Sequence, residues 1–139
     1  MKPWLAIPLL SGVLATAGCS DWGESDDDDA GPTMPPSETV SFASDVQPIF
    51  DGSCVACHGP SGNAGLDLRP GVSHGNLVGV QATQSPLARV EPGEPAASWL
   101  HLKLTGQQDV GTAMPPGNPL ASDRLDLIRT WIDEGAANN

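Results

Sequence analysis

Two cysteines and a histidine stand close together in the chain, in the run Cys54-Val-Ala-Cys57-His58. Two cysteines three positions apart, with a histidine directly after the second, form the attachment signature of c-type haem. The spacing lets both thiols reach the two vinyl carbons on one edge of a porphyrin and places the histidine beneath the ring. The motif therefore predicts one haem c, bound covalently through Cys54 and Cys57, with its iron held by His58.

Three other uses of a Cys-x-x-Cys sequence fit this chain less well. A redox-active pair of the thioredoxin type is expected among β-α-β units, and no stretch shows a convincing period of two. Structural zinc sites usually bring ligands in two spaced pairs, so zinc would require His74 or His101 to complete the set. A disulfide between Cys54 and Cys57 would close a very short, strained loop.

Met114 is the ligand that we expect on the other face of the iron. It lies in the loop 111–119, where the two prolines that follow it stiffen the backbone and glycines permit tight bends. A thioether is a weak ligand, so a loop that positions it in advance suits this role. Met34 also precedes two prolines but lies in an acidic segment. The remaining alternatives are His74, expected to be solvated, and His101, expected at the surface or rim.

Helices must position these residues, because the apolar residues of the region 41–139 recur with a helical period. Ser44 is the expected cap of the first helix and Ser122 that of the last. Three helical segments can be read in the sequence, over about 44–51, 95–104 and 122–134. We expect an all-α fold of three to four helices with long loops, wrapped around the haem.

The chain has 139 residues, with 17 acidic and six basic side chains and a net charge of -11 at pH 7. Such a charge argues against nucleic-acid binding, which requires a basic surface. Hydrophobic residues make up 39%, so the core is expected to be small, and the haem ring would supply much of it.

The first 18 residues are typical of a secretory signal, with Lys2 as the only charge before an apolar stretch. The stretch is too short and too interrupted by glycine and proline for a spanning helix. It ends in Ala17-Gly18-Cys19, which resembles a bacterial lipobox and predicts a lipid on Cys19. Secretion after one of the alanines, without lipid, is the alternative.

Residues 19–40 predict a disordered tether, because they contain seven acidic residues and no basic one. The expected organisation is a signal peptide over 1–18, a lipidated tether over 19–40 and one domain over 41–139. This order predicts a lipoprotein anchored in a membrane of the bacterial cell envelope and facing the periplasm. The alternative is a soluble periplasmic or secreted protein.

The domain resembles the small monohaem class I cytochromes c, and specifically the planctomycete and myxobacterial cytochrome c domains. The resemblance is carried by Phe42-x-x-Asp45-Val46-x-Pro48-Ile49-Phe50, Cys54-x-x-Cys57-His58-Gly59, Gly65-Leu66-Asp67-Leu68-Arg69, Leu77-Val78-Gly79, Val90-x-Pro92-Gly93-x-Pro95-x-x-Ser98-x-Leu100, Lys103-Leu104-x-Gly106, Met114-Pro115-Pro116 and Ile128-x-x-Trp131-Ile132-x-x-Gly135-Ala136. It implies an all-α fold around one haem, with His58 and Met114 as axial ligands.

A haem iron with both axial positions filled has no open site for a substrate. We therefore expect a one-electron carrier rather than an enzyme, exchanging electrons with donor and acceptor proteins. The acidic charge suggests that these partners present basic patches. Two alternatives are a haem-based sensor of gases or other ligands, in which Met114 is labile, and an electron-accepting subunit of a dehydrogenase.

Overall fold

The computed structural model describes residues 39–139. The predicted signal peptide, Cys19, Met34 and all but the end of the predicted tether lie outside these residues. The described chain forms four α-helices and no strand: α1 (Gln47–Ser53), α2 (Ser73–Leu77), α3 (Trp99–Thr105) and α4 (Ser122–Asp133). The expected all-α class is confirmed, and none of the described helices is long and apolar enough to cross a membrane.

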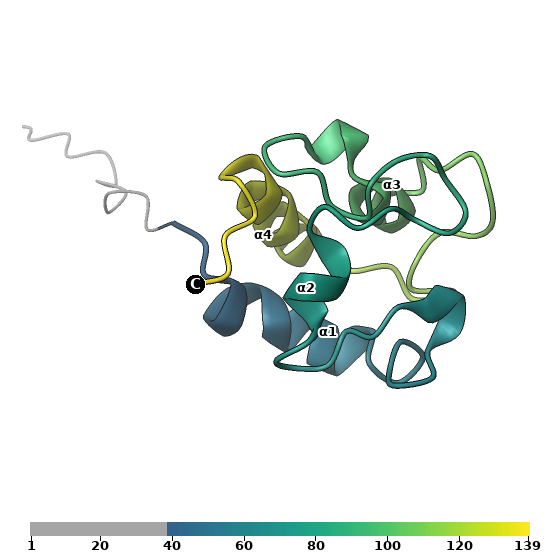
Figure 1. Ribbon diagram of the computed structural model, residues 1–139, viewed down its shortest axis with the longest axis horizontal. Coiled ribbons are helices and arrows are strands. Elements are labelled where there is room, and N and C mark those ends of the chain that lie inside the picture. Colours follow the sequence, from purple (N-terminus) through teal and green to yellow (C-terminus); the bar gives the residue numbers. More distant parts are fainter. Residues whose placement is uncertain (1–38) are drawn as a thin grey trace, which may run out of the picture. The chain divides into compact units, whose positions relative to one another are not determined.

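Shorter elements join these helices. A π-helical turn, Phe42–Val46, leads directly into α1, and single 3-10 turns occupy Asn63–Gly65 and Pro95–Ala97. Two isolated β-bridges, Val78 with Val90 and Gln81 with Ala88, tie the loop between α2 and α3 to itself. In Figure 1, α1 runs along one side of the domain, α3 and α4 lie on the other, and long loops fill the remainder.

The first helical run begins earlier than the sequence predicts. Ser41, in an extended conformation, is the N-cap, and its hydroxyl accepts a hydrogen bond from the backbone N–H of Ser44 at 3.2 Å. The prediction of Ser44 as the cap is therefore wrong, because it is already part of the helical turn. α1 then continues to Ser53, so that the helix ends directly before Cys54.

The predicted helix over 95–104 is interrupted at Ser98. This residue is extended and fully buried. Its hydroxyl accepts the N–H of Glu91 at 2.9 Å and donates to the carbonyl of Glu94 at 2.9 Å. The buried hydroxyl thus fixes an extended residue between a 3-10 turn and α3. α4 matches its expected range, but its N-cap is Ala121 rather than Ser122.

The helix α2 was not predicted, because its five residues carry no apolar period. The prediction that His74, on α2, is solvated is wrong. Its ring is half-buried, with centroids 5.1 Å from Phe42 and 6.1 Å from Trp131, and its Nε2 lies 2.8 Å from the carbonyl oxygen of Ala136. This histidine therefore helps to hold the start and the end of the described chain together.

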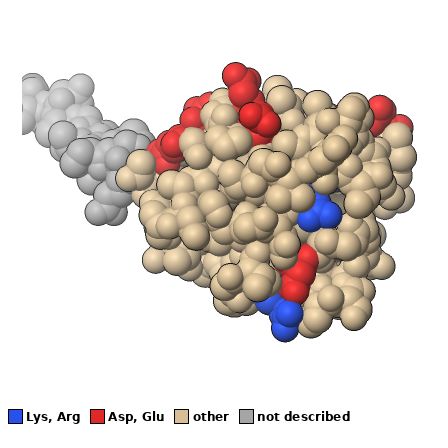
Figure 2. Space-filling view, in the orientation of Figure 1, with Lys and Arg blue, Asp and Glu red and all other residues tan. Residues whose placement is uncertain are grey.

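The hydrophobic core joins α4 to the first helical run and to the loops. Its largest fully buried side chains are those of Trp131, Phe50, Leu68, Leu77, Ile128 and Ile132. Acidic side chains outnumber basic ones on the face shown in Figure 2, and several gather along the edge where α4 lies in Figure 1.

Candidate cofactor site

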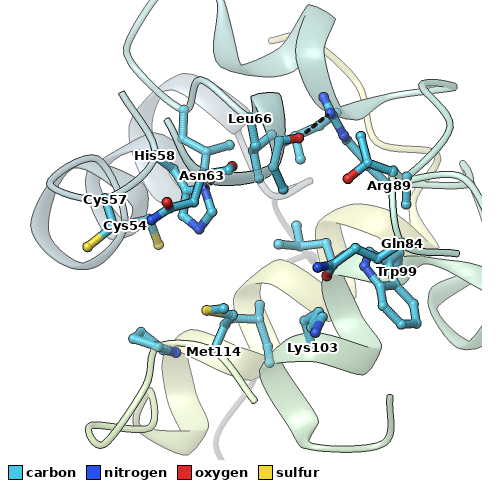
Figure 3. Close-up of a pocket in the computed structure, with 18 of the residues that line it drawn as sticks. Cys54, Cys57, His58, Asn63, Leu66, Gln84, Arg89, Trp99, Lys103 and Met114 are labelled. Carbon is cyan, nitrogen blue, oxygen red and sulfur yellow. Dashed lines mark hydrogen bonds between the residues drawn. The ribbon is translucent and has the colours of Figure 1, made fainter. Parts of the chain in front are cut away.

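One cavity brings together the residues to which the sequence analysis assigns chemistry. It has a volume of about 320 Å³, which is within the range of about 300–1,000 Å³ that is usual for cofactor sites. Cys54, Cys57 and His58, from the loop after α1, line one side, and Met114, from the loop between α3 and α4, lines the other (Figure 3). Much of the remaining wall is apolar, with contributions from Leu66, Leu68, Leu77, Ala82, Leu100 and Leu104.

The cysteine motif begins where α1 ends. The backbone N–H of Cys54 donates to the carbonyl of Phe50 at 2.8 Å and thereby closes the helix. The N–H groups of Cys57 and His58 both donate to the carbonyl of Cys54, at 3.0 and 2.9 Å. This tight turn brings both free thiols to the same end of the cavity, with Cys54 half-buried and Cys57 exposed.

Burial raises the pKa of the Cys54 thiol to about 11. A thiol with such a pKa stays protonated at neutral pH. Redox-active Cys-x-x-Cys pairs have the opposite property, because their environment lowers the pKa of the attacking thiol. The environment of the half-buried Cys54 therefore disfavours the role of a thioredoxin-type nucleophile.

His58 is held by a partner outside its own turn. Its Nδ1 lies 3.2 Å from the carbonyl oxygen of Asn63, which can accept a hydrogen bond only if Nδ1 carries the proton. In that tautomer Nε2 keeps its lone pair for a metal. Asn63 is fixed in turn, because its N–H donates to the carbonyl of Cys57 at 3.1 Å.

Gly62 is required by the close packing of this loop. A Cβ at this position would lie 2.4 Å from the carbonyl oxygen of Leu66 and 2.8 Å from that of Gly59. Both neighbours are backbone atoms and cannot swing away. Sequence reasoning missed the roles of Asn63 and Gly62, and the only signal for them was the high glycine content after the motif.

Met114 is positioned from α3. Its backbone N–H donates to the carbonyl oxygen of Lys103 at 2.8 Å. Its side chain is half-buried, and Pro115 and Pro116 line the cavity beside it. The His58 imidazole and the Met114 thioether, far apart in the sequence, thus lie on opposite walls of one gap (Figure 3).

The end of the cavity away from the cysteines is polar. Gln84, Arg89, Trp99 and Lys103 line it. The guanidinium of Arg89 donates to the carbonyl of Asn76 at 2.8 Å and lies 3.3 Å from those of Ala64 and Gly65. Sequence reasoning did not assign these residues to the site, although the scarcity of basic residues in the domain made Arg89 and Lys103 conspicuous.

Neither alternative histidine lines the cavity. His74 is engaged by Ala136, and His101 lies on α3, where burial and, secondarily, the positive charge of Arg129 lower its pKa. Across the described residues, no three His, Cys, Asp or Glu side chains are placed to share a metal ion. The zinc set considered from the sequence is thus not assembled in this fold.

No family model, curated protein or solved structure matches this chain. The interpretation of the cavity therefore depends on the residues that line it and on their geometry.

Proposed function

We propose that this protein is a one-electron carrier that holds one haem c, with Cys54 and Cys57 as attachment points and His58 and Met114 as axial ligands. The observation that carries the proposal is the meeting of these four residues in one apolar cavity. When bound, the haem supplies an iron that alternates between Fe(II) and Fe(III).

The residues present fit such a group. Both thiols lie at one end of the cavity, as attachment to the two vinyl carbons of one porphyrin edge requires. The apolar walls suit the ring faces. The polar end, with Arg89 and Gln84, suits the carboxylates that a haem carries on the edge away from its vinyl groups.

Each of these side chains has a distinct task. Asn63 orients His58 so that Nε2 is available to the iron. Met114 would be a second ligand to the iron and would leave no coordination site for a substrate. This is the basis for proposing a carrier and not an enzyme. A thioether raises the reduction potential relative to a second imidazole. The leucines of the wall exclude water and favour the less charged Fe(II) state.

The decisive experiment is the expression of the protein in a bacterium that matures c-type cytochromes. The product should be coloured, and its haem should stay with the polypeptide through a denaturing gel and acidic butanone. Replacement of both Cys54 and Cys57 by alanine should release the haem. A colourless wild-type protein, or haem extracted by butanone, would refute the proposal.

The axial assignment has its own test. The oxidised wild type should show the weak near-infrared band of a sulfur-iron bond. Met114→His should abolish this band and lower the potential, while Met114→Ala should allow the reduced protein to bind carbon monoxide. Met34→Ala is the matched control and should do neither. Carbon monoxide binding to the wild type at neutral pH would instead favour the sensor.

We also propose that the domain is tethered to a membrane of the cell envelope by a lipid on Cys19, with a soluble periplasmic or secreted form as the alternative. Support comes from the Ala-Gly-Cys end of the apolar N-terminal stretch. Cys19→Ala should move the protein from the detergent phase to the aqueous phase, or leave its precursor unprocessed. Unchanged partitioning would exclude the lipid anchor.

A further inference from the structure

Lys103 is a buried cation that forms no ion pair with an acidic residue of the described region 39–139. Its residue is 7% exposed, which is unusual for lysine unless its charge is paired. Within residues 39–139 the ion pairs are Asp67 with Arg69 and Asp126 with Arg129, and neither involves Lys103. The positive charge of the ammonium is stabilised instead by the dipoles of two backbone carbonyls and by the ring of Trp99.

The Lys103 ammonium binds the loop that leads to Met114. Nζ donates to the carbonyl of Val110 at 2.7 Å and to that of Thr112 at 3.2 Å, and it lies 5.1 Å from the centroid of the Trp99 ring. These are favourable partners for a cation, because two carbonyl dipoles and the ring face all present negative charge to it.

The same residue also holds Met114 through its backbone. The carbonyl of Lys103 accepts the N–H of Met114 at 2.8 Å. Between the two carbonyls that bind Nζ stands Gly111, where a Cβ would lie only 2.8 Å from Nζ. Three hydrogen bonds thus join the backbone and side chain of Lys103 to residues 110–114. Gly111 lies between them with a φ of 73°, a left-handed conformation that favours glycine.

We propose that Lys103 is a positioning residue for Met114 and that its buried charge favours the reduced iron. This inference rests on the proposed function. Two of the three hydrogen bonds from Lys103 to the loop depend on the ammonium. Its loss should therefore let Met114 dissociate from the iron more often. Fe(III) carries one more positive charge than Fe(II). A fixed cation lining the same cavity opposes oxidation, and burial limits its screening by salt.

Three variants of the holoprotein separate the two effects. Lys103→Arg keeps both the charge and the donors, Lys103→Gln keeps amide donors without the charge, and Lys103→Met removes both. The readouts are the ratio of Fe(II) to Fe(III) at a fixed redox poise and the rate of carbon monoxide binding to the reduced protein. Arg129→Met is the matched control, because it removes a cation that does not line the cavity.

We expect Lys103→Gln and Lys103→Met to lower the ratio of Fe(II) to Fe(III) about tenfold, because each removes one buried positive charge near the iron. A tenfold change in this ratio corresponds to 59 mV for a one-electron couple. Lys103→Met should also bind carbon monoxide several-fold faster than Lys103→Gln. Lys103→Arg and Arg129→Met should stay within about twofold of the wild type on both readouts.

An unchanged ratio in both neutral variants would overturn the electrostatic role, and an unchanged carbon monoxide rate in Lys103→Met would overturn the positioning role. If Lys103→Met does not fold, as judged by circular dichroism, the comparison of Lys103→Gln with Lys103→Arg still decides the electrostatic role. Lys103→Ala, which removes the same donors, then replaces Lys103→Met in the carbon monoxide measurement and decides the positioning role. Failure of the proposed function would be seen separately, as missing covalent haem or a missing sulfur-iron band in the wild type.

Discussion

Replacement of Trp131 by alanine tests the packing that holds the two sides of the domain together. The Trp131 residue is 0% exposed, and its ring centroid lies 5.0 Å from that of Phe42 and 6.1 Å from that of His74. Nε1 donates to the carbonyl of Ala137 at 2.9 Å. Truncation of a fully buried aromatic residue costs about 3–5 kcal/mol in the free energy of unfolding.

The hydrogen bond and the packing contribute separately. Trp131→Phe keeps most of the ring but loses the N–H donor, so it should cost about 1–3 kcal/mol, with roughly 1 kcal/mol from the hydrogen bond. Leu127, on the same helix but 37% exposed, provides the matched control. Leu127→Ala should change the free energy of unfolding by less than about 1 kcal/mol.

Urea denaturation of the haem-loaded protein, followed by far-ultraviolet circular dichroism and by haem absorbance, measures these differences. Coincident transitions with an unchanged m value would show that the variants unfold as the wild type does. A loss below about 1 kcal/mol for Trp131→Ala would refute the reasoning, because the ring would then not be enclosed between Phe42 and His74.

Three further outcomes follow from particular contacts. Gly62→Ala should strongly reduce the yield of haem-loaded protein, since its Cβ would collide with the Leu66 carbonyl; a normal yield on a haem-stained gel would contradict this. Ser98→Ala should lower the free energy of unfolding by about 1–3 kcal/mol, because the partly buried Glu91 N–H loses its acceptor and the fully buried Ser98 hydroxyl is removed. Ser98→Thr should recover part of this loss. Burial holds the pKa of the His101 imidazole below its ordinary 6.5. At mildly acidic pH the unfolded chain therefore binds more protons at this residue than the folded protein does. The free energy of unfolding should fall as the pH drops through and below 6.5. In urea titrations at neutral and mildly acidic pH, His101→Gln should show a smaller fall than the wild type, and an equal fall would exclude this residue as a cause.

Local patterns were sufficient for the attachment motif and the helical class. The proposed haem attachment depends on the spacing of Cys54, Cys57 and His58, which is a property of five consecutive residues. α4 was predictable within about a residue at its C-terminus, because Leu125, Ile128 and Ile132 recur with the helical period. The N-cap residues were not predictable from the sequence. Ser41, Ser44 and Ser122 are all serines and differ only in the backbone conformation that the fold gives them.

Packing between segments that are distant in the sequence decided which residues face each other across the cavity and which side chains are buried. The sequence contains two Met-Pro-Pro runs, and only the fold shows Met114 across a cavity from His58. His74 looks solvated in its glycine-rich context, but it is half-buried and packs against Phe42 and Trp131. The burial of Lys103 is not visible in the sequence, because only folding brings the loop carbonyls to its ammonium. Composition and periodicity describe neighbours along the chain, whereas burial and ligand geometry arise from contacts between residues that only folding brings together.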